Sequence, residues 1–337
     1  MKDAIKKVVA GQNLTREEAA IAMDSIMQGN ATPSQIAALL VALRIKGESI
    51  DEITGFAEKM REHATHIYPK SANLVDTCGT GGDHAGTFNI STVSAIVAAS
   101  AGVPIAKHGN RSVSSRCGSA DVLEALGVKI DLDPEKVRES IDTVSFGFIF
   151  APNFHKAMRF AMPTRKEIGI STVFNILGPL TNPANAKAQV MGVFREELTE
   201  IMAQVLKNLG TKHALIVHGL DGLDELSLTE KTRVTELKEG KIETFFIQPE
   251  DFGFARVKKE ELVGGSAEEN AEIALQILDD CEKAAKRNIV LLNAGAAIYV
   301  GGKAKNIKEG VALAQAAIDT GKAKQKLEQI IDLYALM

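Results

Sequence analysis

The run Asp76-Thr77-Cys78-Gly79-Thr80-Gly81-Gly82-Asp83 sets the architecture of this chain. Residues 73–78 predict a short buried strand, and the glycines follow it directly. Because glycine lacks a Cβ, these positions suit a loop that takes unusual dihedral angles and lets a ligand approach its backbone. The run therefore predicts a strand that ends in a phosphate-binding loop.

A helix start comes directly after this loop. Asn89-Ile90-Ser91-Thr92 precede an apolar stretch over 93–101, which predicts a helix with Ser91 or Thr92 as its N-cap. The free amides and the positive dipole end of such a helix would face the glycine loop, so we expect anions to bind here. The loop matches neither common nucleotide motif, because a P-loop needs lysine after its last glycine, where Asp83 stands, and the dinucleotide fingerprint needs glycine where His84 stands.

A second unit of the same kind follows. Strand-like residues 103–106 lead into Lys107-His108-Gly109-Asn110-Arg111-Ser112-Val113-Ser114-Ser115-Arg116, and Ser119 begins the next helix. Cations and hydroxyls crowd this segment, which suits a polyphosphate. Ser112 or Ser114 alone could equally be a solvated loop residue, whereas the whole cluster is harder to explain in that way.

An acidic pair, Asp224 and Glu225, follows the predicted strand 214–218 in a βα loop at the carboxyl edge of the sheet. Such a pair is often only a solvated surface turn. The same edge, however, collects cations and hydroxyls for a pyrophosphate, and Mg²⁺ is commonly held by one or two carboxylates together with substrate phosphates. The pair therefore predicts a magnesium site.

The N-terminal part of the chain predicts a small all-helical domain. Residues 1 to about 66 have a helical period without a strand, and capping boxes begin at Thr15, Thr32 and Ser49. The apolar residues of this part exceed what a small bundle needs for one core. Some of them could face a partner chain or pack on the second domain.

After a hinge at 68–71, the pattern alternates between strands and helices, which indicates a parallel sheet. Residues 152–183 are helical again, and 289–297 predict a turn from strand to helix. The predicted fold class is therefore α/β: a small helical domain and a larger domain with a central, mainly parallel sheet flanked by helices.

The composition excludes several classes of protein. The 337 residues carry a formal net charge of −4, no tryptophan and no basic stripe with interleaved aromatics, so we expect no nucleic-acid surface. The longest apolar stretch, 93–106, is too short and too interrupted to cross a membrane. The N-terminus lacks a secretory pattern, which predicts a cytoplasmic protein. Cys78, Cys117 and Cys281 lack the spacing of a disulfide framework or a zinc site.

Five segments together resemble the signature blocks of the anthranilate phosphoribosyltransferase family, in that family's order and spacing. These segments are 78–83, 86–92, 107–115, 175–183 and 221–225. The resemblance implies a fold like that of the second family of nucleoside phosphorylases and a homodimer joined through the small domains. It places the active site between a small domain, 1–70 with 154–183 returning to it, and a larger domain of 71–153 and 184–337.

The reaction implied by the resemblance transfers the phosphoribosyl group of phosphoribosyl pyrophosphate to the amine of anthranilate, with Mg²⁺ as the cofactor. No side chain is a covalent nucleophile, and Lys107, Arg111 and Mg²⁺ stabilise the transition state. The implied phosphoribosyl pyrophosphate contacts are Gly79, Gly82, Asp83, Thr87, Asn89, Ile90, Ser91, Thr92, Lys107, His108, Gly109, Asn110, Arg111, Ser112, Val113, Ser114, Ser115 and Ser119. The implied anthranilate contacts are Gly79, His108, Asn110, His155, Arg165, Gly178 and Pro179. The implied metal ligands are Ser91, Asp224 and Glu225.

Two other functions fit parts of the pattern. A pyrimidine nucleoside phosphorylase of similar fold would use phosphate as the acceptor and should carry Lys-His-Ser where Thr77-Cys78-Gly79 stands. A divergent homologue that binds nucleic acid should be strongly basic and should have lost the acidic pair. Lys156, where the family has proline, and His84-Ala85 depart from the family's pattern, and for Arg165 a helix-surface ion pair is the alternative interpretation.

Overall fold

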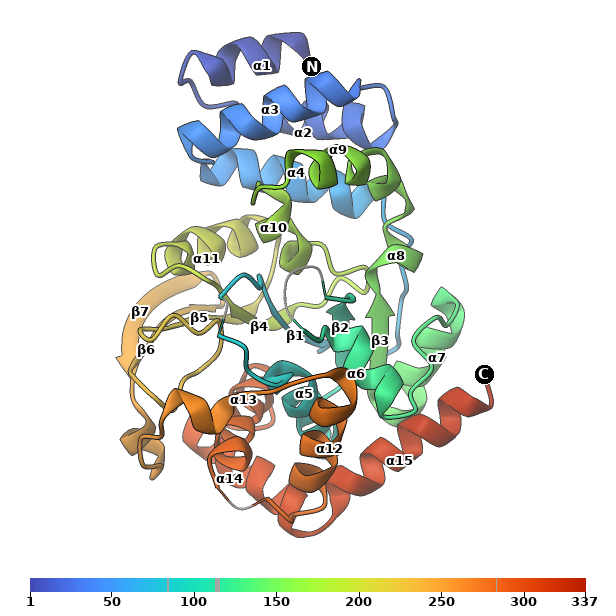
Figure 1. Cartoon of the computed structure of the whole chain (residues 1–337), viewed down its shortest axis with the longest axis vertical. Coiled ribbons are helices and arrows are strands. Elements are labelled where there is room, and N and C mark those ends of the chain that lie inside the picture. Colours follow the sequence, from blue (N-terminus) through green and yellow to red (C-terminus); the bar gives the residue numbers. More distant parts are fainter. Residues whose placement is uncertain (84, 113–115, 283) are drawn as a thin grey trace.

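The computed structural model describes residues 1–337 except 84, 113–115 and 283. Four helices form the N-terminal part, drawn in blue at the top of Figure 1: α1 (Lys2–Val9), α2 (Arg16–Met27), α3 (Pro33–Lys46) and α4 (Ile50–Glu62). The predicted capping boxes are confirmed, because the side chains of Thr15, Thr32 and Ser49 each accept a hydrogen bond from the backbone N–H three residues on. These boxes fix where α2, α3 and α4 begin.

A seven-stranded sheet forms the centre of the larger part, in the order β3-β2-β1-β4-β5-β6-β7. The first five strands of this order are parallel, and the last two are antiparallel to their neighbours. The strands are β1 (Val75–Gly79), β2 (Ile105–Gly109), β3 (Phe146–Phe150), β4 (Ala188–Gly192), β5 (His213–Gly219), β6 (Thr232–Lys238) and β7 (Lys241–Ile247). Sequence analysis assigns no strand to the residues of β6.

Both faces of the parallel part of the sheet are buried, and alternate residues of each strand point to opposite sides. Leu215 and Val217 of β5 belong to one hydrophobic core, and Ala214 and Ile216 belong to the other. The helices that belong to the first core are α5 (Ile90–Ser100), α6 (Ser119–Ala125), α7 (Pro134–Val144), α12 (Ala267–Leu278), α13 (Ala285–Val300), α14 (Ile307–Asp319) and α15 (Lys322–Ala335). Helix α11 (Leu198–Asn208) and the N-terminal helices belong to the second.

The chain returns to the N-terminal helices after β3. Here it forms α8 (Ala151–Phe154), α9 (Met162–Ile168) and α10 (Phe174–Leu177), together with 3₁₀ turns at 156–160 and 178–180; further 3₁₀ turns lie at 249–252 and 259–262. Figure 1 shows α9, in green, beside α3, and α10 packs on α4. Buried Ala161, Phe174 and Leu177 share one core with Phe56 and Met60 of α4. The helical character predicted for 152–183 is confirmed.

The predicted strand-to-helix turn at 289–297 is wrong, because these residues lie inside the continuous helix α13. The glycine that looked like a turn signal serves helix packing instead. A Cβ on Gly295 would lie 2.6 Å from the Val311 nitrogen of α14, and a Cβ on Gly310 would meet the Gly295 carbonyl oxygen. The two glycines let α13 and α14 cross at close range.

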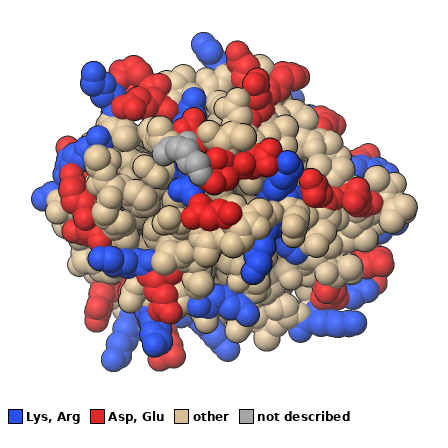
Figure 2. Space-filling view, turned by 90° about the horizontal axis from the view of Figure 1, so that it is seen from below, with Lys and Arg blue, Asp and Glu red and all other residues tan. Residues whose placement is uncertain are grey.

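The described residues include no helix that is long and apolar enough to cross a membrane. Figure 2 shows the molecule from the side of α12 to α15, where basic and acidic side chains alternate over the surface. This face carries no continuous basic stripe, in agreement with the small net charge of −4.

Candidate functional site

The loops that follow β1, β2, β4 and β5 meet at the carboxyl edge of the sheet, beside β1, where the strand order reverses. The Thr80 N–H donates to the Gly192 carbonyl at 2.9 Å, and the Gly81 N–H donates to Asp224 Oδ2 at 2.9 Å. A Cβ on Gly79 would lie 3.0 Å from the Asp224 carboxyl carbon. Glycine at position 79 therefore lets the acidic pair lie directly against the glycine loop.

The carboxyl groups of Asp83, Asp224 and Glu225 lie close together at this edge. Burial and the nearby Asp83 carboxyl raise the pKa of Asp224 to about 7. Burial and Asp224 raise the pKa of Glu225, although Lys107 and the Ser91 amide oppose the rise. Buried carboxylates of this kind fit a divalent cation. The described residues hold no cluster of three or more His, Cys, Asp or Glu side chains placed to bind a metal, so substrate oxygens would have to complete the coordination.

Lys107 lies beneath this edge and is 1% exposed. Its ammonium donates to the Thr77 carbonyl at 2.5 Å and to Ser91 Oγ at 3.2 Å. Burial lowers the pKa of Lys107, and the nearby Asp76 carboxyl opposes that change. The structure thus brings Ser91, Lys107 and Glu225 together, as the sequence analysis predicts for a site that binds pyrophosphate and a metal.

Asn89 links the two predicted binding loops. Its side-chain amide donates to the Cys117 carbonyl at 3.1 Å, and its side-chain oxygen accepts from the amide of Asn270 at 3.0 Å. Helix α5 begins at Ile90 with Asn89 as its N-cap residue, so the predicted cap at Ser91 or Thr92 is wrong. Asn89 makes no side-chain capping bond because both ends of its amide are already used.

Asn270 is a residue that the sequence analysis misses. It is 2% exposed, and its side-chain oxygen also accepts from the Gly265 N–H at 2.7 Å. The backbone just before this segment also contacts the loop that follows β1, since Val263 forms an antiparallel bridge with Thr87. No local signal marks its link to the site, because its partner Asn89 lies far away in the chain.

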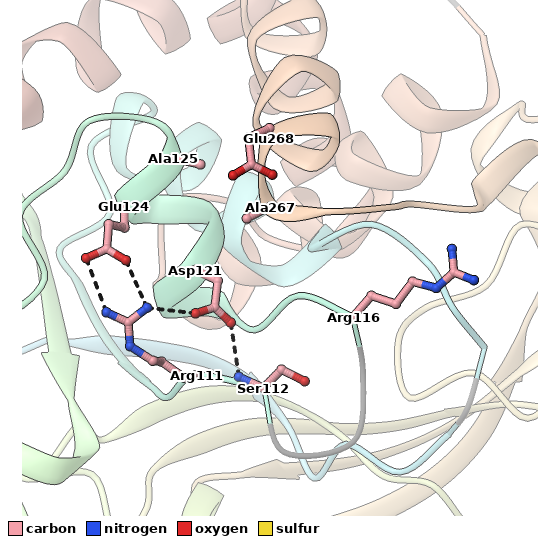
Figure 3. Close-up of a pocket in the computed structure, with 8 residues that line it drawn as sticks. All are labelled: Arg111, Ser112, Arg116, Asp121, Glu124, Ala125, Ala267 and Glu268. Carbon is pink, nitrogen blue, oxygen red and sulfur yellow. Dashed lines mark hydrogen bonds and ion pairs between the residues drawn. The ribbon is translucent and has the colours of Figure 1, made fainter.

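Arg111, which is predicted to bind phosphate, forms ion pairs with two carboxylates of α6. Its guanidinium contacts Asp121 Oδ1 at 2.9 Å and Glu124 Oε2 at 2.8 Å, and Figure 3 shows the three side chains together. Ser119 Oγ accepts from the Asn110 N–H at 3.2 Å. A cavity of about 620 Å³ lies beside these residues and is also lined by Ser112, Arg116, Ala125, Ala267 and Glu268. Val113, Ser114 and Ser115 lie outside the described residues.

The predicted anthranilate contacts His108 and His155 lie together, with ring centroids 5.0 Å apart. Both are buried, and the Nε2 atom of each has no hydrogen-bond partner within the described part of the chain. Burial lowers the pKa of His108 to about 3 and that of His155 to about 4, and His155 and His66, respectively, add to the effect. Both imidazoles are therefore neutral at pH 7.

Arg165 lies over the Phe174 ring, 5.0 Å from its centroid, and its Nη1 is 3.5 Å from Met162 Sδ. Burial lowers the pKa of Arg165, and no carboxylate of the described residues pairs with it. The helix-surface ion pair considered in the sequence analysis is therefore absent there. A partly buried guanidinium without an anion is suited to bind one.

Buried Gln189 and partly buried Arg61 hold the predicted pocket wall at Gly178 and Pro179. Gln189 of β4 donates to the Pro179 carbonyl at 2.7 Å, and the Nε of Arg61 in α4 donates to the Leu180 carbonyl at 2.6 Å. The sequence analysis misses both. A polar residue inside the apolar strand at position 189 is a signal that could have been used, whereas Arg61 looks like any arginine on a helix.

Known proteins resemble the chain over nearly its whole length. Residues 71–324 match the glycosyl transferase family, a/b domain, and residues 2–64 match the helical bundle domain of the same family. A curated anthranilate phosphoribosyltransferase from Acetivibrio thermocellus is 55% identical over 332 residues, which cover 98% of this chain and 96% of the relative.

Solved structures agree with this match. The crystal structure of anthranilate phosphoribosyltransferase from Thermus thermophilus has 46% identity and a TM-score of 0.94, with 99% of each chain covered. The Saccharomyces cerevisiae enzyme in complex with PRPP and Mg has 28% identity and a TM-score of 0.91. The same enzyme in complex with 4-fluoroanthranilate has 27% identity and a TM-score of 0.90. Each match covers 100% of this chain and 98% of that chain. On these sequence and structure matches, the chain belongs to the anthranilate phosphoribosyltransferase family.

Proposed function

We propose that the chain transfers the 5-phosphoribosyl group from phosphoribosyl pyrophosphate to the amine of anthranilate. The products are N-(5′-phosphoribosyl)anthranilate and pyrophosphate, in the second step of tryptophan biosynthesis from chorismate. The observation that carries the proposal is the meeting, beside β1, of the glycine loop with the buried pair Asp224 and Glu225. The relative at 55% identity and the yeast complexes support the same donor and acceptor.

Asp224, Glu225 and Ser91 would hold Mg²⁺ on the donor side. When bound there, Mg²⁺ would supply positive charge that offsets the charge of the leaving pyrophosphate. Lys107 places a second positive charge beside the proposed Mg²⁺ ligands, since its ammonium contacts Ser91 Oγ. These fixed charges act where the leaving group gains negative charge, which is the largest source of rate in such a site.

His108, His155 and Arg165 would hold anthranilate. The guanidinium of Arg165 can form a fork with the carboxylate of the acceptor, because no protein carboxylate within the described residues competes for it. The neutral imidazoles offer acceptor nitrogens without placing a charge beside the aromatic ring. The aryl amine is already neutral at pH 7, so positioning contributes more than deprotonation.

The other proposed donor contacts follow the loops. These contacts lie at the last residue of β1 or β2, in the loops after these strands or at the start of the helices that follow: Gly79, Gly82, Asp83, Thr87, Asn89, Ile90, Thr92, Gly109, Asn110, Ser112 and Ser119. The Arg111 guanidinium can contact the phosphates only if it breaks its ion pairs with Asp121 and Glu124. If it keeps these ion pairs, it can serve the donor substrate only by holding the loop in position. The remaining assignments, at 113–115, rest on the resemblance alone.

We also propose a cytoplasmic homodimer with the domain division given by the resemblance. In support of the division, residues 161–180 share a core with the N-terminal helices. In support of the dimer, Val9, Ile21 and Ile45 of the helical part are 69%, 58% and 82% exposed. Sedimentation equilibrium should give a mass of twice 36.1 kDa, and replacing Ile45 by glutamate should shift it toward one chain.

The function is tested by the loss of anthranilate fluorescence on mixing the protein with phosphoribosyl pyrophosphate and Mg²⁺. The parent protein should turn over, and a variant with Asp224→Asn and Glu225→Gln should lose most of that rate at low Mg²⁺. Glu260→Gln and Glu261→Gln, an exposed acidic pair, form the matched control. If a folded parent that binds phosphoribosyl pyrophosphate left anthranilate unchanged, the donor site would stand and the acceptor would be wrong.

A further inference from the structure

The segment that follows β2 leaves the sheet at Asn110 and returns at Gly118, and one carboxylate joins the two ends. The N–H of Ser112 donates to Asp121 Oδ2 at 3.1 Å, and the N–H of Gly118 donates to the same oxygen at 2.8 Å. The other oxygen, Oδ1, accepts from Arg111 at 2.9 Å, as Figure 3 shows. Asp121 thus closes the neck of this segment, the place where residues 110–112 and 117–119 lie side by side.

The neck is too narrow for any residue except glycine at position 118. A Cβ there would lie 2.6 Å from the Arg111 carbonyl carbon and 2.7 Å from the Asn110 carbonyl oxygen, both of them backbone atoms that cannot turn aside. The Asn110 carbonyl also accepts from the Ala120 N–H at 3.2 Å. Close packing at Gly118 and the hydrogen bonds of the neck therefore each fix how residues 110–112 lie against residues 117–119.

A carboxylate is the group that this position requires. Three donors converge on its two oxygens, and an ionised carboxylate is an acceptor with no proton of its own. Burial opposes ionisation, but the two backbone donors and Arg111 hold the pKa of Asp121 below its ordinary value. Asparagine has one oxygen and one NH₂ group, so it can satisfy the backbone donors or Arg111 but not both.

The neck is connected to the first binding loop. The side chain of Asn89 donates to the Cys117 carbonyl at 3.1 Å, within the returning half of the neck. A change in the neck would therefore be felt on both loops that are proposed to bind phosphoribosyl pyrophosphate, whereas the anthranilate contacts His155 and Arg165 lie on another part of the chain.

We propose that Asp121 is a positioning residue for phosphoribosyl pyrophosphate: its carboxylate holds the neck closed and thereby sets the positions of Asn110, Arg111 and Ser112. The inference rests on the proposed function and deepens it. In this arrangement Arg111 serves the donor substrate through the loop that it stiffens, with Glu124 as its outer partner.

The test compares three variants with the parent protein by steady-state kinetics for each substrate. Asp121→Asn removes one anchor, and Gly118→Ala opens the neck without touching the carboxylate. We expect both to raise the KM for phosphoribosyl pyrophosphate by about tenfold or more, because charge-assisted hydrogen bonds are lost, and to raise the KM for anthranilate less, because Asn110 is the one implied anthranilate contact within the neck. Glu135→Gln is the matched control, since Glu135 makes a similar paired contact with Arg138 at an exposed site; it should change neither value.

Two kinetic outcomes would overturn the proposal. An equal rise of both KM values would indicate general damage to the structure. A lower KM for phosphoribosyl pyrophosphate in Asp121→Asn would mean that this carboxylate competes with the substrate for Arg111.

A second readout does not depend on activity. Trypsin cleaves after the exposed Arg116, and the cleavage should be several-fold faster in Asp121→Asn and Gly118→Ala than in the parent and in Glu135→Gln. Equal cleavage rates in all four proteins would contradict the proposal that Asp121 holds the neck closed. If the parent showed no binding of phosphoribosyl pyrophosphate, the proposed function would fail, while the cleavage rates would still decide whether Asp121 holds the neck.

Discussion

The donor side and the acceptor side of the site treat their polar groups differently. On the donor side, Lys107, Asn89 and Asp224 have hydrogen-bond partners within the protein. The buried Thr92 hydroxyl is the exception, with no partner among the described residues. On the acceptor side, the Nε2 atoms of His108 and His155 have none among the described residues, and Arg165 has no anion there. A polar group with a hydrogen-bond partner is held in place before the ligand binds. A buried polar group without a partner contributes most to binding free energy when the ligand supplies the missing hydrogen-bond partner.

The difference predicts which kinetic constant each side controls. A preorganised, charged donor side stabilises the developing pyrophosphate and should affect kcat. An acceptor side with open hydrogen-bonding positions should affect the KM for anthranilate and the choice of acceptor. The following substitutions test that division, beginning with the largest expected effect.

Lys107→Met removes the buried cation of the donor side. We expect kcat to fall by about a hundredfold to a thousandfold, which is the range for losing one fixed electrostatic contact to a transition state. Lys129→Met, at an exposed lysine, is the control. Circular dichroism must show that the variant is folded, because an uncompensated buried carboxylate near Lys107 also costs stability. An unchanged kcat would remove Lys107 from the donor site.

Arg165→Gln removes the unpaired guanidinium of the acceptor side. The KM for anthranilate should rise by roughly tenfold to a hundredfold, the value of a charge-assisted hydrogen bond, while that for phosphoribosyl pyrophosphate stays the same. Arg165→Lys should recover little, since an ammonium cannot reproduce the planar fork. Arg159→Gln is matched, because Arg159 also lies over a phenylalanine ring but is exposed. Equal changes in the two KM values would contradict the division.

The two histidines make stability depend on pH in a defined direction. Their pKa values are about 3 and about 4 in the folded protein, against an ordinary value of 6.5, so the unfolded chain binds protons first as the pH falls. The free energy of unfolding should therefore decrease below pH 6.5 and continue to decrease toward pH 4, by up to about 1.4 kcal/mol per pH unit for each histidine.

This pH dependence can be measured by urea unfolding at pH 7.5, 6.0 and 5.0. His155→Gln removes one titrating group, so its free energy of unfolding should fall less steeply over this range than that of the parent. Parallel pH profiles for the two proteins would show that His155 is not held neutral by its surroundings.

The smallest effect is expected at Cys78, on the border between the two sides. Burial raises the pKa of its thiol, so the thiolate needed for nucleophilic attack is scarce at pH 7. Its contact is a hydrogen bond from Gln189, 3.1 Å from Sγ. Cys78→Ser should keep turnover within about threefold of the parent, since a hydroxyl accepts the same bond. A much larger loss would reopen the question of a covalent step.

Sequence analysis predicted the parts of the fold that depend on local rules. The boxes at Thr15, Thr32 and Ser49 depend on neighbours in the chain, and the structure confirms them. The strand predicted over 73–78 is also present, with bounds Val75–Gly79. Strand β6 was missed, and α13 was misread at Gly295, because an apolar run and a glycine have several meanings until the packing partner is known.

The same limit applies to the site. Lys107, Ser91 and the acidic pair were predicted to lie together, and they do. Asn270, Gln189, Arg61 and the neck formed by Asp121 escaped prediction, because each acts on a residue that is distant in sequence or on a backbone atom that carries no signal of its own.

The return of residues 161–180 to the N-terminal helices has a consequence during synthesis. The first four helices leave the ribosome about a hundred residues before the segment that completes their core, which at 5–20 residues per second is a delay of roughly 5–20 seconds. During that time Phe56 and Met60 lack their later partners Phe174 and Leu177. A nascent chain stalled soon after α4 has left the ribosome should therefore be digested quickly by proteases, and one stalled well beyond residue 210 should resist them.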